Sequence, residues 1–235
     1  MENPFLAVPK KPEEKQPRYV PPIDDFWKVY THVEQLAADG DDRNMQDRVM
    51  LLAYLHLAAR RSELFKAKWS DVDFANSQIR LGTRKREGGL EYDWLPLTTE
   101  LHADLLMWAQ RRLAHSTMDK EHLFVCLSPL PCCDRHYGLP FKQRRWTMGK
   151  WCDKAKVKPF GWHAIRHLTA LELYRHGYSV KHIQAVLRHQ RATTTDIYLR
   201  SLGVGQALRE TLNNGLSRDN LVVLKQKKTA SGGQT

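Results

Sequence analysis

The chain has 235 residues, of which 42% are hydrophobic. This suits one large domain, or one domain with a tail, and it excludes global disorder because a real core can form. The 37 Lys and Arg residues outnumber the 26 Asp and Glu residues and give a net charge of +11, which favours a polyanionic partner such as nucleic acid but also fits a merely soluble basic protein.

The N-terminal third is predicted to be an arm followed by helices. Residues 1–22 hold six of the eleven prolines, mixed with charged residues. Proline fixes an extended backbone and offers no donor, so we interpret this stretch as a linker or arm. A helix then begins at Asp24 and carries apolar residues at helical spacing to Ala37. A second helix is predicted over 44–58 and a third, short one after Arg61.

The pattern changes to short strands between Asp71 and Leu97. A polar, Gly-containing hairpin with the sequence RKREGGLE separates the second strand from the third. The predicted strands are 72–74, 78–81 and 93–96.

Helices resume after the strands. Gly177 is the expected stop of the third of them. The predicted helices are 100–115, 141–155, 163–176, 180–188 and 194–202. The sequence therefore predicts a mainly α domain with a small three-stranded antiparallel sheet (α+β) over residues 23–220, and a tail over 221–235.

The cysteines and the hydropathy pattern exclude several other classes of protein. Cys132 and Cys133 are adjacent and no C-x-x-C pair occurs, so a disulfide framework is not expected. Together with His136 they match no familiar zinc pattern, and reduced thiols are the simpler interpretation. Neither a signal peptide nor a long apolar run is present, so we expect no membrane association and a cytoplasmic location.

Four residues in the C-terminal third form a pattern suited to attack on a phosphodiester: His163, Arg166, His189 and Tyr198. Tyrosine can be a nucleophile, histidine can move protons near neutral pH, and arginine can hold two phosphate oxygens at once. The first two lie three positions apart at a helix start, where free N–H groups favour an anion. Tyr174 and Tyr178 are weaker candidates for the nucleophile because they fall between the pair His163 and Arg166 and the pair His189 and Tyr198.

The segments GWHAIRH and LRHQRATTTDIYLRSL resemble the two C-terminal signature boxes of the tyrosine recombinases, the phage integrase family. The family pattern is H-x-x-R-H, then leucine-glycine-histidine, then a tyrosine. Arg188 stands where the family usually has glycine. The resemblance runs from about Pro21 to about Gly205 and implies the mainly α catalytic fold of that family.

The resemblance also implies a second arginine, in the family's G-x-R-x-x-E-L box. The matching phrase here is LAARRSEL. Alignment on Glu63 and Leu64 assigns the arginine to Arg60, with the adjacent Arg61 as the alternative. Ala58 replaces the usual glycine, and Glu63 is interpreted as structural, either capping or pairing with backbone near the arginine.

A lysine in the turn of the small hairpin is the remaining family position, and Lys85 is the only lysine in this hairpin. Other basic residues near the boxes are expected to contact the DNA backbone. This DNA-binding set is Arg61, Arg84, Arg86, Arg188 and Arg191.

The chemistry implied by the resemblance is metal-free and uses no cofactor. Tyr198 attacks the scissile phosphate of double-stranded DNA, forms a 3′-phosphotyrosyl link and releases a 5′-hydroxyl. Arg60 and Arg166 offset negative charge, and His189 hydrogen-bonds a non-bridging oxygen. The two proton-transfer roles fall to His163 and Lys85. The family implies a tetramer on DNA, with weak or no self-association without it, and association with the nucleoid.

Two other functions share this fold. A type IB topoisomerase would relax DNA with the same chemistry, and a non-catalytic module would only bind DNA, although it would need neither Tyr198 nor His163. Family members carry an N-terminal helical domain ahead of a linker, so we expect this chain to be a catalytic part. The apolar run 221–224 in the tail either docks on a neighbouring subunit, as the family implies, or folds back on its own domain.

Overall fold

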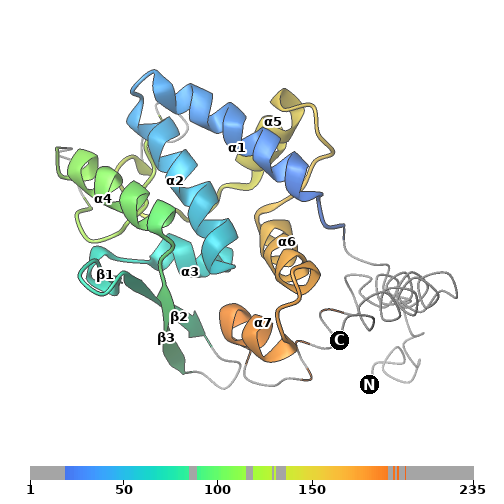
Figure 1. Ribbon diagram of the computed structural model, residues 1–235. Coiled ribbons are helices and arrows are strands. Elements are labelled where there is room, and N and C mark those ends of the chain that lie inside the picture. Colours follow the sequence, from blue (N-terminus) through green and yellow to red (C-terminus); the bar gives the residue numbers. More distant parts are fainter. Residues whose placement is uncertain are drawn as a thin grey trace, which may run out of the picture.

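The computed structural model describes residues 19–84, 89–114, 119–128, 130, 136–189, 193, 195 and 199. It consists of helices around one central helix, with a small sheet at one side (Figure 1). The helices are α1 Ile23–Ala38, α2 Asp42–Leu57, α3 Arg61–Lys66, η2 Trp69–Asp71, α4 Thr99–Ala114, α5 Arg145–Lys154, α6 Trp162–Arg175 and α7 Val180–Leu187. The strands are β1 Val72–Asp73, β2 Gln78–Arg84 and β3 Leu90–Pro96.

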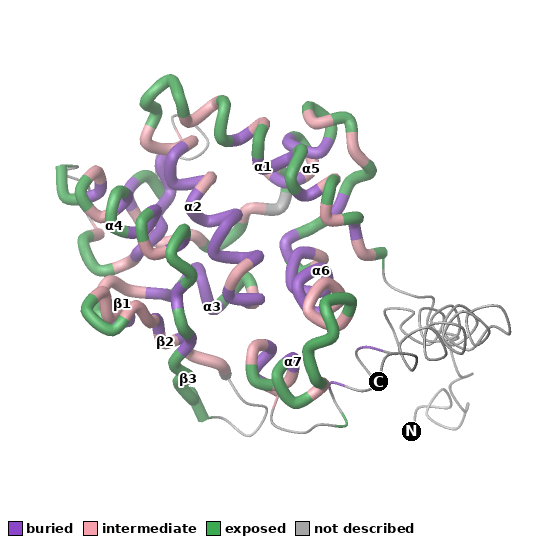
Figure 2. Tube along the Cα trace, in the orientation of Figure 1, coloured by how far each residue is buried: buried purple, intermediate pink, exposed green. Residues whose placement is uncertain are grey.

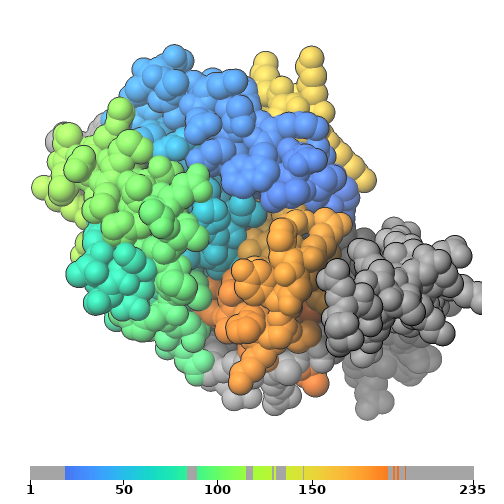
Figure 3. All heavy atoms as spheres, in the orientation of Figure 1, coloured from blue at the N-terminus to red at the C-terminus, as the bar shows by residue number. Residues whose placement is uncertain are grey.

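Helix α2 is the centre of the fold. Eleven of its sixteen residues are buried, because α1, α4 and α6 all pack against it. Figure 2 shows this burial along α2, and in the space-filling view the later part of α2 shows in a gap between α4 and the strands on one side and α6 and α7 on the other (Figure 3). Asp41 caps its start by accepting a hydrogen bond from the N–H of Arg43 at 2.8 Å. A helix enclosed in this way holds its C-terminal end in a fixed position.

The sheet is antiparallel, with strand order β1-β2-β3. Ile79 pairs with Leu95 and Thr83 pairs with Glu91 in the β2–β3 ladder. Ile79, Leu81 and Leu95 are buried against the core, which fixes the register because a shift by one residue would expose them. Helix α3 packs beside β2, so the far end of β2 lies near the C-terminal end of α2.

The core has two parts. The larger part joins α1, α2, α4, α5, α6 and the sheet. The smaller part lies where α6 and α7 meet the end of α2, and its buried members are Ala58, Ala170, Ile183, Leu187 and Leu199. Leu199 is therefore held against the end of α2 and α7 although it is far along the chain.

The predicted fold class is confirmed, and the helices and strands lie close to their expected positions. The strands of the hairpin extend further than predicted, to Arg84 and from Leu90, because the ladder continues to the Arg84–Leu90 pair. The expected helix 141–155 is shorter and begins at Arg145. In the described part of the chain, every helix is too short or too polar to cross a bilayer.

Several sequence predictions fall outside the described residues. Most of the arm 1–22 and the whole tail 221–235 lie there, as do Cys132 and Cys133. Of the expected helix 194–202, the structure describes Thr195 and Leu199, both of them helical.

Candidate active site

The site is built where two helices end. The α2 helix ends at Ala58 (φ 44°) and the α7 helix ends at Arg188 (φ 53°), both in the left-handed conformation. A left-handed C-cap turns the chain sharply and leaves the last carbonyls of the helix exposed to other partners. These are the two positions where the family usually has glycine, and a positive φ explains that preference.

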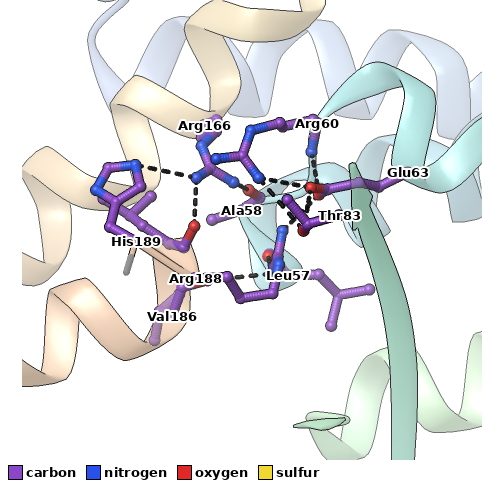
Figure 4. A network of polar contacts seen from close by, with 10 residues as sticks. Leu57, Ala58, Arg60, Glu63, Thr83, Arg166, Val186, Arg188 and His189 are labelled. Atoms are coloured by element: carbon purple, nitrogen blue, oxygen red, sulfur yellow. Dashed lines mark hydrogen bonds and ion pairs between the residues drawn. The ribbon is translucent and has the colours of Figure 1, made fainter. Parts of the chain in front are cut away.

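Arg166 connects the two helix ends. It projects from α6, and its residue is 1% exposed. One Nη1–H group donates to the Ala58 carbonyl at 2.5 Å, and Nη2 donates to the Leu187 carbonyl and lies 3.3 Å from Nε2 of His189. A cation at two helix C-termini is stabilised by the negative ends of their dipoles. The guanidinium is therefore fixed in place without substrate (Figure 4).

Arg60 approaches the same place from the loop before α3. Its Nη1 donates to Oε1 of Glu63 at 2.6 Å and lies 3.5 Å from the Thr83 hydroxyl, which itself donates to Glu63 Oε1 at 2.9 Å. Oε2 of Glu63 accepts the backbone N–H of Arg60 at 2.8 Å. The predicted structural role of Glu63, pairing with backbone near the arginine, is thus confirmed. The Arg60 side chain keeps 33% of its surface exposed.

Arg188 lies inside this network. Its side chain is 1% exposed, and its Nη2 donates to Oε2 of Glu63 at 2.6 Å. Its Nη1 donates to the Leu57 carbonyl at 3.0 Å. The expectation that Arg188 faces DNA from an exposed surface is therefore wrong, because the side chain is taken up by a buried carboxylate and a helix end.

His189 is held as a neutral ring. Its Nε2 faces a guanidinium nitrogen of Arg166, which can only donate, so Nε2 accepts and the ring proton sits on Nδ1. Nδ1 then donates to the Thr195 hydroxyl at 3.0 Å. Burial, and then the charges of Arg166, Arg60 and Arg188, lower the pKa of His189 to about 4. A carboxyl group responds in the opposite way: burial raises the pKa of Glu63, but Arg188 and Arg60 outweigh it and leave the pKa below its ordinary value.

The other candidates with described side chains lie at the edge of this network or beyond it. His163 is exposed in the first turn of α6 and its ring packs edge-on against His167, with the ring centroids 4.6 Å apart. Arg61 is exposed at the start of α3. Tyr174 packs half-buried against the smaller core, and Tyr178 is exposed and pairs with a ring on α7.

Lys85, Arg86, Arg191 and Tyr198 lie outside the described residues, and Arg84 is described only as the last residue of β2. Their described neighbours do contact the site. Thr83, two residues before Lys85, bonds Glu63. Thr195 bonds His189 and is fully buried, and Leu199 is buried in the smaller core.

Thr83 and Thr195 are site residues that the sequence analysis missed. The hydroxyl of Thr195 fixes the tautomer of His189. The sequence did offer two signals. Thr83 lies on the strand that leads to the predicted lysine, and Thr195 lies between the predicted histidine and tyrosine. Threonine is too common in strands and caps for either signal to single it out.

The match to a family model decides which family this arrangement belongs to. The model of the phage integrase family matches residues 29–203. The chain belongs to the phage integrase family.

Relatives and solved structures agree with this assignment. The tyrosine recombinase XerC of Chlamydia caviae is 28% identical over 178 residues, which cover 72% of this chain and 53% of the relative. A crystal structure of XerA recombinase superposes with a TM-score of 0.64 and 24% identity, covering 91% of this chain and 68% of that one. A post-cleavage complex of XerH with its difH substrate has a TM-score of 0.63 and 17% identity, and the match covers 85% of this chain and 53% of that one.

These likenesses confirm the tyrosine recombinase catalytic fold. This phage integrase family chain spans about half the length of the curated relatives it matches, 50–53% of each. Within the family fold, residues from three separate parts of the chain meet at one place: the loop after α2, the start of α6 and the end of α7.

Proposed function

We propose that this protein cleaves and rejoins double-stranded DNA as a site-specific tyrosine recombinase. One observation carries the proposal: Arg60, Arg166 and His189 meet at the ends of α2 and α7, with Thr195 attached to His189. A binding module would need positive charge on its surface, but it would not need a buried guanidinium and a tautomer-locked imidazole. The matched relatives are named as recombinases, which favours recombination over topoisomerase-like relaxation.

The scissile phosphate would bind against the exposed part of Arg60 and the edge of Arg166. Both groups are already hydrogen-bonded to the protein on their other side, so little ordering cost remains when the phosphate arrives. Two guanidinium groups offset the charge that builds up on the non-bridging oxygens as the fifth bond to phosphorus forms.

Nε2 of His189 would become a donor only when DNA binds. In the free protein its Nε2 accepts from Arg166. A bound phosphate brings negative charge to the site, which raises the pKa of the imidazole and draws the Arg166 donor toward its oxygens. His189 can then take a proton on Nε2 and donate it to a non-bridging oxygen.

Tyr198 is the proposed nucleophile, and Thr195 and Leu199 on either side of it are held in place against His189 and the smaller core. Its oxygen bonds to phosphorus while the bond to the 5′-oxygen breaks. His163 would take the tyrosine proton, because free tyrosine has a pKa of about 10 and attacks poorly at neutral pH. Lys85 would give a proton to the leaving oxygen.

The bond to Tyr198 retains the energy of the broken phosphodiester, so a 5′-hydroxyl from a partner strand can reverse the reaction. The arginines supply the positive charge, and the proposed reaction uses no metal and no cofactor. Exchange of strands between two duplexes needs four active sites, so we propose a tetramer on DNA and association with the nucleoid. Residues 23–220 would form the catalytic domain.

Covalent capture tests the proposal. The protein is incubated with a pool of nicked duplexes of randomised sequence, in which the short cleaved strand diffuses away and traps the intermediate. We expect a detergent-resistant protein–DNA band that Tyr198→Phe abolishes and Tyr178→Phe retains, since only the first change removes the proposed nucleophile. Peptide mapping should then place the DNA on Tyr198.

A band that maps to Tyr174 or Tyr178 would move the nucleophile, and the absence of any adduct would contradict the proposed activity. Relaxation of a supercoiled plasmid without exchange between two duplexes would favour the topoisomerase alternative instead.

A further inference from the structure

Glu63 is shared between two arginines. Its Oε1 pairs with Arg60 at 2.6 Å and its Oε2 with Arg188 at 2.6 Å. The side chains of Glu63 and Arg188 are 2% and 1% exposed, whereas that of Arg60 is 33% exposed. Solvent therefore cannot screen the charge of Arg188, whereas a ligand can reach the exposed part of Arg60.

An arginine at position 188 is costly for the backbone. Its φ of 53° lies in the left-handed region that glycine tolerates best. A side chain in that conformation persists when its surroundings hold it. Here the surroundings are the Glu63 carboxylate and the Leu57 and Val186 carbonyls, all within hydrogen-bond distance of the guanidinium. The strain at this turn is thus coupled to the charge inside the site.

Charge counting shows what Arg188 changes. With Arg60 as its sole partner, Glu63 would form a neutral pair, and Arg60 would have little charge left for a phosphate. With Arg188 present, the group Arg60–Glu63–Arg188 carries one net positive charge. Because the Glu63 charge is already offset inside the protein, the charge of Arg60 is available at its exposed side.

We propose that Arg188 is a positioning residue: it neutralises Glu63, so that Arg60 can direct its full charge at a phosphate bound beside Arg166 and His189. The proposal rests on the proposed function for the identity of that phosphate as a DNA phosphodiester. It is specific to this chain's sequence, because a glycine at this position cannot supply the charge.

The same charge acts on His189. Among the described residues, the charged groups facing this ring are Arg166 on α6, Arg60 before α3 and Arg188 beside it, with Glu63 behind the last two. Asp93 on β3 acts in turn on Arg188. Removal of Arg188 takes away one cation and leaves Glu63 less balanced, and both effects make it easier to protonate His189.

The experiment compares three variants of the whole chain with the unchanged protein. Arg188→Gly removes the guanidinium and suits the positive φ. Arg188→Gly/Glu63→Gln removes both buried charges and restores the count to one net positive charge on Arg60. Arg111→Gln, which removes an arginine in the last turn of α4 that pairs with Asp42 at the start of α2, controls for net charge. Inorganic phosphate is the probe, and its binding and the His189 pKa are followed by the ring shifts of His189, assigned with His189→Gln.

We expect Arg188→Gly to bind phosphate about tenfold more weakly, the order of effect of removing one unit charge roughly 10 Å from the anion at an effective dielectric constant of about 20. The pKa of His189 should rise. The double variant should regain most of the phosphate affinity and bring the pKa of His189 down again. Arg111→Gln should resemble the unchanged protein in both measurements.

Unchanged phosphate affinity and an unchanged His189 pKa in Arg188→Gly would overturn the inference. So would a double variant that binds phosphate no better than the single one, since Arg188 would then act through packing. Melting curves for each variant exclude unfolding as the cause. Covalent capture of DNA is independent of these measurements, so its failure would count against the proposed function and not against the charge of Arg188.

Discussion

Arg144 and Arg188 are both buried arginines with a carboxylate partner, but they belong to different kinds of network. The guanidinium of Arg144 and the carboxylate of Asp47, whose side chains are 9% and 4% exposed, form a bidentate pair. Nη1 donates to Oδ1, and Nη2 donates to Oδ2 at 2.7 Å. Phe141, Trp151 and Trp162 lie under the guanidinium, with the nearest ring centroid at 4.7 Å. Cation and anion balance one another there, and aromatic rings close the site.

At Glu63 one carboxylate serves two arginines, and one of the two remains partly exposed. The contrast teaches how to separate structural from functional buried charge in this fold. A closed, balanced pair fixes α5 and α6 to α2, whereas an unbalanced group that opens to solvent is what the proposed phosphate site requires.

The largest expected effect is on the balanced pair. Asp47→Asn leaves the Arg144 charge buried without its partner, and we expect the free energy of unfolding to fall by about 3–5 kcal/mol. Urea denaturation measures it. Phosphate binding per folded molecule should stay as it was. A loss of phosphate affinity without a loss of stability would show that the two networks are not separate in function.

The next effect concerns Arg60 and its neighbour. Arg60→Lys keeps a charge but loses the planar fork that binds Glu63 and a phosphate together, so cleavage should slow by about 100-fold. Arg61→Lys is the matched control, because Arg61 is exposed at the start of α3. Single-turnover cleavage of a captured substrate from the pool measures both. If Arg61→Lys were the slower variant, the arginine of the G-x-R-x-x-E-L box would be misassigned.

The smallest effect is on pH dependence. His189 resists protonation when folded, with a pKa lowered from 6.5 to about 4, while the unfolded chain takes up the proton near 6.5. Stability is therefore full above that pH and is lost as the pH falls from about 6.5 to about 4. His189→Asn should flatten this part of the plot of melting temperature against pH. The matched control is His176→Asn, which removes one imidazole at the exposed end of α6. Equal profiles for all three proteins would contradict the lowered pKa.

Much of the fold was readable from local patterns. The helix over α1, the strands around the RKREGGLE hairpin and the stop of α6 near Gly177 follow from hydrophobic period, turn residues and caps. The strand ends were less predictable, since Arg84 and Leu90 join the ladder through cross-strand pairing that a single strand does not encode.

Residue type and spacing singled out Arg166 and His189, and the resemblance to the family added Arg60, because residue type and order along the chain are properties of the sequence. The packing of α2 against α6 and α7 decided the rest. It gave Arg188 a buried carboxylate instead of a DNA phosphate, made Thr195 the partner of His189 and lowered the pKa of that ring. Burial and charge environment arise from residues more than a hundred positions apart, such as Glu63 and Arg188. Local sequence therefore determined which groups this protein carries, and only the tertiary structure decided which of them face one another and which remain open to a substrate.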